Sequence, residues 1–408
     1  MVSKYDVFYV VASSGELRII DILNTLNKPE HDYQRVFNLV LSLEREGFVK
    51  RKENVKIIHT EKSRTLFRLV SFCIDNNINY NLLFKKTMRG FVLKAAKKEF
   101  FTIGDIKVHP QTFNFYVEAL ERYGFLLVIS RKPLKCKLLR HHFLMDLSQF
   151  FGKKLLFYNS KQHSYIKEIK KELNKYKKRL KIHPGFIEGL SSKQEVNFIY
   201  LSLNLEGNPL TLPETQRLLL EDIIPAKYRL IHIHEVTNYK KALDLMIANA
   251  KKRMKLDLPL ILQYHSIAMS HIPAAGEIRR QNVRIKLNPN FKTADWRIIV
   301  EKMGELMRKY EGFESRIQTI EEVINFASFF HNEFQRIHPF IDGNSRISRL
   351  LMLHILRSQG IPLLDVPIGY FDLYLDLTKR STKRDDQALK YLVEELVLSN
   401  LKKINSLA

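Results

Sequence analysis

Residues 338–349 read HPFIDGNSRISR, and they join two segments with the apolar spacing of helices. The segment before them is rich in Phe and Ala up to Arg336, and Leu and Ile recur at helical spacing after Ser345. Pro, Gly and Asn lie between these segments and are typical of a helix end, a turn and a new helix start. We therefore predict a helix, a short polar loop and a second helix that begins at the Gly-Asn turn.

The side chains of this loop suit chemistry on phosphates. A helix N-terminus presents unpaired backbone N–H groups and the positive end of the helix dipole to an anion. Arg346 and Arg349 are three residues apart, so they share a helix face and can bind several phosphate oxygens. Asp342 offers a hard oxygen ligand for Mg²⁺, and His338 is of the side-chain type that most readily takes a proton near neutral pH. The combination indicates phosphoryl or nucleotidyl transfer.

The same residues resemble the signature of the Fic family, HPFx(D/E)GNGRxxR. The positions that match in register are His338, Pro339, Phe340, Asp342, Gly343, Asn344, Arg346 and Arg349. Ser345 stands where the family usually has Gly, but its backbone N–H can still donate to a phosphate. The resemblance extends over roughly residues 195–400. It implies a protein adenylyltransferase that moves AMP from ATP to a Ser, Thr or Tyr hydroxyl of a protein, and the chain itself is a candidate target.

The resemblance also implies roles for individual residues. His338 would be the catalytic base, and Asp342 would hold Mg²⁺. The ATP phosphates would be bound by Gly343, Asn344, Ser345, Arg346 and Arg349. Residues Gly276–Ile285 resemble the family flap, an exposed hairpin to which a target segment adds as a strand through main-chain hydrogen bonds.

An inhibitory element is implied further upstream. Residues 202–208 read SLNLEGN and resemble the family's inhibitory motif, (S/T)xxxE(G/N). Ser202 and Glu206 are four residues apart on one predicted helix face, and Gly207 can end that helix. In the family this glutamate pairs with the second arginine of the active-site helix, here Arg349. The resemblance therefore implies that the chain is autoinhibited by Glu206.

The first half of the chain predicts another kind of module. Residues 1–62 and 86–142 each show helical patterns followed by a basic hairpin, which is typical of a winged helix-turn-helix. The two copies share an echo, LEREGFV at 43–49 and LERYGFL at 120–126. Within residues 143–190, apolar positions at helical spacing predict a basic connecting helix. The predicted fold class is mainly α: winged helix-turn-helix modules with small β wings, then a helical Fic domain at 195–400 with a β-hairpin flap.

The charge of the chain favours a polyanionic partner. The net charge is +24, and residues 1–190 carry 36 Lys and Arg against 18 Asp and Glu. Such a field favours duplex DNA, bound through residues 1–142. The alternative is a solvated, lysine-rich surface with no such partner. The positions that would contact phosphates on the two wings are Arg51, Lys52, Lys56, Arg131, Lys132 and Lys135.

Composition indicates the cellular compartment of the protein. Its 2 cysteines, Cys73 and Cys136, lie far apart and form neither a disulfide framework nor a zinc motif, which suits a reducing compartment. No apolar run reaches the ~18 residues of a membrane span. We therefore expect a cytoplasmic protein with no membrane contact. The sequence does not determine the oligomeric state.

Two other functions remain open at this point. One is removal of AMP from a modified protein by the same site, with Glu206 orienting water. The other is a DNA-binding transcriptional regulator whose Fic domain is not catalytic, although the intact His338 and Asp342 favour catalysis. Among other histidines, we interpret His331 as a packing residue, and we interpret His232 with His234 as a loop or core pair rather than a metal site.

Overall fold

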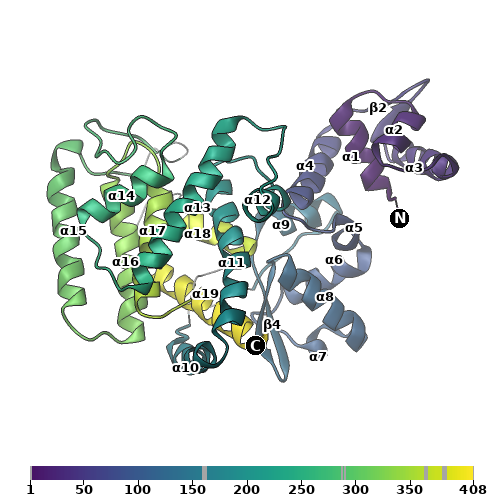
Figure 1. Ribbon diagram of the computed structural model, residues 1–408. Coiled ribbons are helices and arrows are strands. Elements are labelled where there is room, and N and C mark those ends of the chain that lie inside the picture. Colours follow the sequence, from purple (N-terminus) through teal and green to yellow (C-terminus); the bar gives the residue numbers. More distant parts are fainter. Residues whose placement is uncertain are drawn as a thin grey trace. The chain divides into compact units, whose positions relative to one another are not determined.

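The computed structural model describes residues 2–158, 163–285, 288, 291–362, 366–378 and 384–407. Contacts divide the chain into two units. The first comprises Met1–Leu126 and Ser130–Tyr158, and the second comprises Leu127–Ile129 and Asn159–Ala408. The fold is mainly α with small antiparallel hairpins, which confirms the predicted fold class (Figure 1).

The elements before residue 158 alternate short helices with two hairpins. In chain order they are α1 (Lys4–Ser14), α2 (Ile19–Thr25), η1 (Glu30–Asp32), α3 (Tyr33–Arg45), β1 (Val49–Arg51), β2 (Val55–Ile57), α4 (Glu61–Asp75), α5 (Tyr80–Leu83), α6 (Lys86–Ala95), α7 (Ile103–Ile106), α8 (Pro110–Arg122), β3 (Leu126–Arg131), β4 (Leu134–Leu138) and α9 (His142–Phe150). Each hairpin gains an isolated bridge from an earlier segment, Leu17 to Val55 and Phe101 to Cys136. Both halves of the unit thus repeat one order of helices, bridge and hairpin.

The repeated sequence at 43–49 and 120–126 has one structural role in both copies. Gly47 and Gly124 take φ of 78° and 74°, a conformation open to glycine, and end α3 and α8. The N–H groups of Phe48 and Phe125 then donate to the carbonyls of Leu43 and Leu120, at 2.9 Å each. This is the Schellman type of helix end, after which the hairpin begins. The observation supports the two winged modules at 1–62 and 86–142, which stay a prediction.

The second unit is a helical bundle. Its elements are α10 (Ile166–Ile182), α11 (Pro184–Asn204), α12 (Leu212–Leu220), α13 (Leu230–Lys251), α14 (Leu258–Ala268), η2 (Trp296–Ile298), α15 (Ile299–Glu314), α16 (Ile320–Ile337), α17 (Asn344–Ser358), η3 (Ile368–Tyr370), α18 (Phe371–Leu377) and α19 (Asp386–Leu407). Helix α17 is the centre, because nearly all of its residues are buried and it packs against α13, α14 and α16. A helix buried on all sides carries polar side chains only where they are paired or functional.

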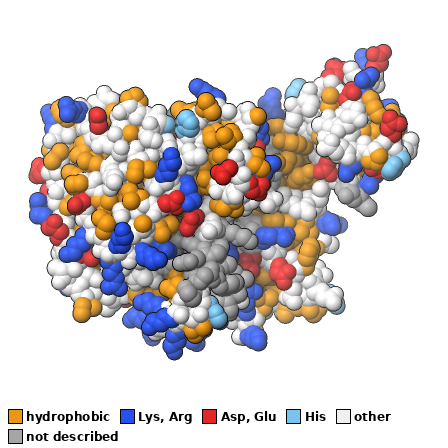
Figure 2. Space-filling view, viewed as in Figure 1, with side chains coloured by type: hydrophobic (Ala, Val, Ile, Leu, Met, Phe, Trp, Pro, Cys, Tyr) orange, Lys and Arg blue, Asp and Glu red, His pale blue; other side chains and the backbone are white. Residues whose placement is uncertain are grey.

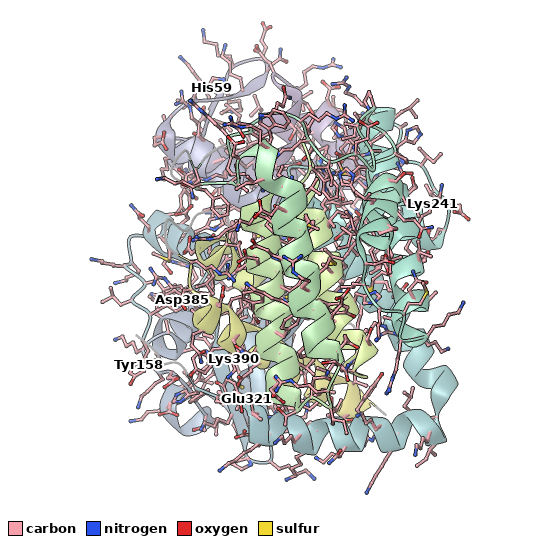
Figure 3. The ribbon with its side chains drawn as sticks, turned by 90° about the vertical axis from the view of Figure 1, so that its left-hand side faces the viewer. His59, Tyr158, Lys241, Glu321, Asp385 and Lys390 are labelled. Carbon is pink, nitrogen blue, oxygen red and sulfur yellow. The ribbon has the colours of Figure 1, made fainter. Side chains whose placement is uncertain are left out.

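Helix α19 closes the bundle beside α16. The two helices pack along their length, and Lys390 of α19 pairs with Glu321 in the first turn of α16 at 2.7 Å (Figure 3). Glu321 also suits the positive end of the α16 dipole. This packing fixes the direction of α16, whose C-terminus carries His338.

The basic helix α10 lies within the predicted range 143–190 but is shorter than that range. Residues 143–190 do not form one connecting helix, since α9 belongs to the first unit while α10 and the start of α11 belong to the second. The apolar stripe of α10 is buried against α19, and the lysines of α10 face solvent (Figure 2). The stripe consists of Ile166, Ile169, Leu173 and Tyr176, whereas Leu180 is 38% exposed. Burial of this stripe makes α10 part of the bundle.

The structure also bears on membrane contact. Over the described residues, we find no helix whose length and hydropathy would suit a transmembrane span.

Candidate functional site

The loop between α16 and α17 begins at His338, which has a left-handed backbone with φ 53° and ψ 59°. This conformation is uncommon for a residue with a side chain and has to be held by its surroundings. The His338 N–H donates to Phe334 O at 2.9 Å, and Nδ1 lies 3.1 Å from Gln335 O. A carbonyl only accepts, so Nδ1 donates, and in the neutral ring Nε2 is then the atom that can take a proton.

Asn344 closes the loop on itself. Its Oδ1 accepts from Phe340 N at 2.9 Å, and its Nδ2 donates to Phe340 O at 2.8 Å. Both bonds hold the loop, and phosphate binding by Asn344 stays a prediction. The sequence did not reveal this pair, because an Asn at a helix start suits either role.

Gly343 marks a close approach of the backbone to its neighbours. Its φ is 82°, and a Cβ there would lie 2.8 Å from the Met269 side chain and 3.2 Å from His265 Nε2. A glycine is therefore required both for conformation and for space. Gly343 precedes α17, so the first N–H groups of α17, including that of Ser345, lie at the helix end that favours anions.

Arg346 lies between two carboxylates. Its Nη2 is 2.9 Å from Asp342 Oδ2, and its Nη1 is 3.4 Å from Glu235 Oε1. Its Nε is buried and has no hydrogen-bond partner among the described residues. Buried donors are almost always paired, so an unused one beside a helix N-terminus is an observation that itself suits an anionic ligand.

Asp342 has the properties of a magnesium ligand. Its side chain is 60% exposed, and its Oδ1 accepts from Gly343 N at 2.6 Å. Mg²⁺ in nucleotide sites is bound by one or two carboxylates together with substrate phosphates. An accessible carboxylate next to a phosphate-binding helix end fits that requirement.

Arg349 contacts the end of α11. Its Nη2 lies 3.0 Å from Glu206 Oε1 and 2.9 Å from Ser202 O, and its Nε donates to Ser202 Oγ at 2.7 Å. The side chains of Arg349 and Glu206 are only 7% and 17% exposed. Burial opposes the charge of Arg349, but Tyr374 and Glu206 outweigh it and hold the pKa of Arg349 above its ordinary value. The structure thus brings together Glu206 and Arg349, which are 143 residues apart in sequence.

A hydrogen-bond chain connects the two arginines of α17. Ser202 Oγ donates to Tyr239 Oη at 2.9 Å, and Tyr239 Oη donates to Arg346 O at 3.1 Å. Because Ser202 also accepts from Arg349, the end of α11 contacts Arg349 directly and Arg346 through Tyr239 of α13. Sequence reasoning did not single out Tyr239, and its pattern within α13 is that of any core tyrosine.

Glu235 was also missed. Besides Arg346, it accepts from Asn208 Nδ2 at 2.7 Å and lies 3.7 Å from His271 Nε2. Asn208 directly follows the Glu206-Gly207 turn, so this contact is a second connection between the turn and the arginines. Glu235 lies on α13 together with His232 and His234, and thus not in a loop.

His265 connects the loop to residue 276. It is 1% exposed and stacks on Phe340, with ring centroids 3.6 Å apart. Its Nδ1 accepts from Gly276 N at 2.8 Å, and its Nε2 lies 3.0 Å from Asp342 O. Burial lowers the pKa of His265 to about 4, so the ring is neutral at pH 7 and donates through Nε2.

Residues 276–285 differ in detail from the predicted hairpin. No strand is assigned to them, and residues 286–287 and 289–290 lie outside the described part. Side chains connect the segment to its return instead of a ladder: Asn282 Oδ1 accepts from Trp296 N at 3.0 Å, and Thr293 Oγ1 donates to Val283 O at 3.4 Å. Among the described residues the segment forms no β ladder, and its backbone is bonded by side chains and by the loop, as in the bond from Arg279 N to Pro339 O.

His331 packs in the core. It is fully buried, and its Nε2 lies 2.8 Å from Tyr374 Oη. Burial lowers the pKa of His331 to about 4, so it is a neutral partner of Tyr374 and not a second base. The contact places Tyr374 beside Arg349.

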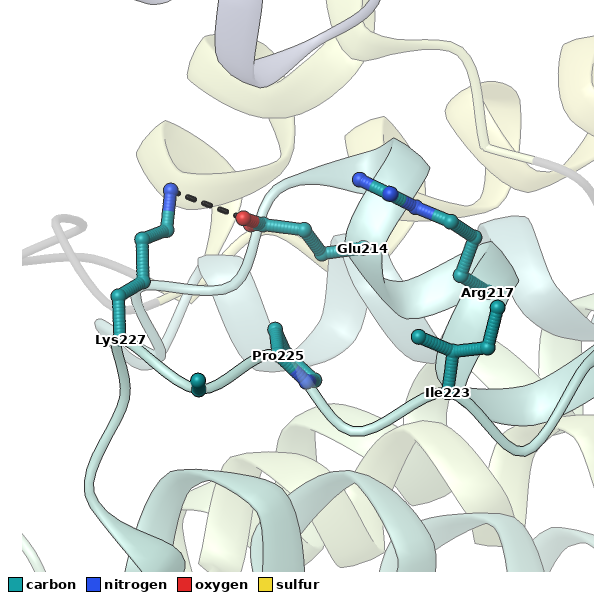
Figure 4. Close-up of a pocket in the computed structure, with 6 residues that line it drawn as sticks. Glu214, Arg217, Ile223, Pro225 and Lys227 are labelled. Carbon is teal, nitrogen blue, oxygen red and sulfur yellow. Dashed lines mark ion pairs between the residues drawn. The ribbon is translucent and has the colours of Figure 1, made fainter.

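A pocket at α12 shares no lining residue with this site. Its lining includes Glu214, Arg217, Ile223, Pro225 and Lys227, and Lys227 Nζ lies 2.8 Å from a Glu214 oxygen (Figure 4). Burial would raise the pKa of Glu214, but hydrogen bonds from Lys227, Thr211 and Tyr228 lower it to about 2. Glu214 also caps the start of α12, accepting from Thr211 N at 2.9 Å. Its charge is therefore used by the fold.

Comparison with known proteins agrees with this geometry. Residues 255–356 match the model of the Fic/DOC family, and this range contains the whole loop, Arg346 and Arg349. This part of the chain is therefore similar to the Fic/DOC family.

Two curated relatives are each named "Protein adenylyltransferase Fic". The one from Drosophila erecta is 29% identical over 199 residues, and the one from Drosophila grimshawi is 30% identical over 200 residues. Each match covers 48% of this chain, and it covers 39% and 40% of the two relatives. The matched part of the chain thus spans about two-fifths of their length.

A solved structure shows the same fold. The crystal structure of a Fic domain containing signaling protein from Bacteroides thetaiotaomicron aligns with a TM-score of 0.52 at 21% identity. The alignment covers 59% of this chain and 96% of that one. The helical bundle around α16 and α17 is therefore a Fic fold.

Proposed function

We propose that this chain is a protein adenylyltransferase, which transfers AMP from ATP to a hydroxyl of a protein. The observation that carries the proposal is the loop 338–343, where a histidine at one helix end meets an anion-binding helix start. The start of α17, which carries Arg346 in its first turn, is the feature that most directly suits a phosphate. The name of the matched relatives supports the same reaction.

In the proposed reaction, His338, Arg346 and Asp342 have different roles. His338 Nε2 takes the proton from a Ser, Thr or Tyr hydroxyl, and the oxygen attacks the α-phosphorus of ATP. The bond from the α-phosphorus to the oxygen that bridges to the β-phosphorus breaks, and pyrophosphate leaves. Arg346 and the first N–H groups of α17 bind phosphate oxygens as charge moves toward the leaving group. Asp342 would hold Mg²⁺, which neutralises phosphate charge when bound.

Glu206 would restrain this reaction. Arg349 is held by Glu206 and by Ser202, and its fork cannot bind a terminal phosphate at the same time. ATP bound beside a paired Arg349 would therefore have its α-phosphorus out of line for attack. We propose that release of Glu206 turns the enzyme on.

The proposed reaction can be tested with ATP that carries a radioactive label in either the α-phosphate or the γ-phosphate. With ATP labelled in the α-phosphate, the chain should label protein, whereas ATP labelled in the γ-phosphate should not. Label transferred only from the γ-phosphate would show a kinase instead. Release of AMP from a modified protein, with no transfer from ATP in any variant, would favour the hydrolytic alternative in which Glu206 orients water.

A second function is supported by the first unit. We propose that it binds duplex DNA through the two hairpins, as an accompaniment to catalysis rather than as the role of a non-catalytic regulator. The basic side chains on the hairpins are exposed, namely Arg51, Lys52, Lys56, Arg131, Lys132 and Lys135. Exposed cations on a wing can reach phosphates without cost to the core.

Salt dependence tests the DNA proposal. The full chain should bind duplex with a log–log salt slope of about −0.9 per phosphate contacted. The double variant Lys52→Glu/Lys56→Glu should bind more weakly and with a shallower slope, because contacts to phosphate are lost. Lys241→Glu/Lys251→Glu, on two exposed lysines of α13, is the control with the same charge change; Lys241 is labelled in Figure 3. Absence of binding to any duplex at low salt, or equal loss in the control, would contradict the proposal.

A further inference from the structure

Arg279 is a third arginine at the loop, and it is not one of those expected to bind phosphate. It lies in the segment 276–285 and is only 2% exposed. Its Nε donates to His338 O at 2.7 Å, and its Nη2 is 3.5 Å from Ile337 O. Its own backbone N–H donates to Pro339 O at 2.9 Å. One residue thus contacts three consecutive carbonyls at and after the end of α16.

The other end of the guanidinium holds a different part of the chain. Nη1 donates to Gln281 O and Nη2 donates to Ala294 O, both at 2.6 Å. Gln281 belongs to the segment 276–285, and Ala294 belongs to its return. Ala294 N in turn donates to Arg336 O at 2.9 Å. Arg279 therefore fixes the loop of the base, the segment expected to bind the target, and the return of that segment against one another.

The partners of this charge are unusual. Among the described residues, Arg279 has no ion pair with a carboxylate, and the hydrogen bonds of its side chain go to backbone carbonyls. A buried charge is costly unless it is well bonded. Here the end of α16 supplies compensation, because the last carbonyls of a helix are unpaired and carry the negative end of its dipole. The planar fork of an arginine can serve several carbonyls at once, whereas a lysine cannot match that geometry.

The left-handed backbone of His338 explains why the bond from Arg279 is needed. A residue held in the left-handed region costs on the order of 1–3 kcal/mol and persists only where its surroundings enforce it. Arg279 bonds to the carbonyl of that same residue. Loss of the bond would let the peptide after His338 rotate and carry the imidazole away from its place.

We propose that Arg279 is a positioning residue that sets His338 and the target-binding segment in one geometry for transfer. This inference rests on the proposed function, since it assigns to Arg279 the orientation of the base of that reaction. It differs from a phosphate-binding role, because the guanidinium is already bonded to carbonyls and lies under the loop.

The test compares the buried Arg279 with an exposed arginine elsewhere in the activated Glu206→Gly chain. Arg279→Lys should lower kcat by roughly 10²-fold, the cost of misplacing a reacting group by about 1 Å. The KM for ATP should stay the same, because Arg346, Arg349 and the start of α17 are unchanged. Arg308→Lys is the matched control, since Arg308 is an exposed arginine on α15, outside the segment 276–285. It should leave both kcat and KM unaltered.

Two further readouts separate positioning from loss of the fold. In Arg279→Ala, methylguanidinium should restore part of kcat, and methylammonium should not. The NMR signal of the His338 ring, assigned by its loss in His338→Ala, should shift in Arg279→Lys and stay in place in Arg308→Lys. An unchanged kcat together with an unmoved His338 signal in Arg279→Lys would overturn the inference. Absence of transfer in Glu206→Gly itself would instead count against the proposed function, while the NMR comparison would still decide the role of Arg279.

Discussion

The His338→Ala variant should lose transfer of AMP while it keeps nearly all of its affinity for ATP. His338 is the only side chain of the loop placed to take the proton of the target hydroxyl, since Asp342 pairs with Arg346 and His331 is buried beside Tyr374. Removal of a general base lowers the rate by on the order of 10²–10⁴. The anion-binding groups lie on α17 and do not depend on the imidazole. ATP affinity and label transfer should therefore separate in this variant.

Two control variants distinguish loss of the base from a change of fold. His338→Asn keeps a residue that tolerates the left-handed backbone but cannot act as the base, so it should be as inactive as His338→Ala. His234→Ala removes an exposed histidine of α13 and should retain full activity. Full transfer by either His338 variant would show that the proposed chemistry is wrong.

The Glu206→Gly variant should gain activity, most visibly as modification of the chain itself. Glu206 and Arg349 are both largely buried, so their pair is stronger than an exposed ion pair, which is worth about 0–1 kcal/mol. Loss of the carboxylate frees the fork of Arg349 for the terminal phosphates and brings the α-phosphorus into line. A misplacement of about 1 Å can cost ~10²-fold, so the gain should be in the transfer rate more than in ATP affinity.

Variants of Arg349 test whether Glu206 acts through this arginine. If Glu206 acts by occupying Arg349, then Arg349→Ala should be inactive and Glu206→Gly should not rescue it. Glu221→Gly removes an exposed carboxylate after α12 and serves as the control for the substitution. Unchanged or lower transfer in Glu206→Gly would exclude the inhibitory role and favour the hydrolytic alternative, in which Glu206 is itself catalytic.

The features of the site that can be predicted from sequence are those determined by residues close to one another in the chain. The end of α16 and the start of α17 follow from Pro, Gly and Asn within a few residues, and the shared face of Arg346 and Arg349 follows from their spacing. The contact of Glu206 with Arg349 was predicted only through the family resemblance, because no local pattern connects residues 143 positions apart. The structure brings that pair together, while its inhibitory effect stays a proposal.

The parts that sequence did not predict depend on contacts between distant segments. Arg279, His265 and Glu235 act through backbone carbonyls and side chains that the fold brings to the loop, and each is an ordinary residue within its own helix or segment. Helix α10 shows the same limit, because its apolar stripe was evident but its partner α19 lies more than 200 residues away. The bonds of Asn344 to Phe340 were likewise not predicted, since an amide suits backbone groups as well as a phosphate.

The most direct test of the central claim is the intact mass of the Glu206→Gly chain after incubation with ATP and Mg²⁺. The account predicts a gain equal to one AMP unit, and it predicts that the gain is absent from the Glu206→Gly/His338→Ala double variant. A lysate treated with the active variant should contain proteins with the same added mass. No gain on any protein, a gain equal to one phosphate, or a gain that persists without His338 would contradict the account.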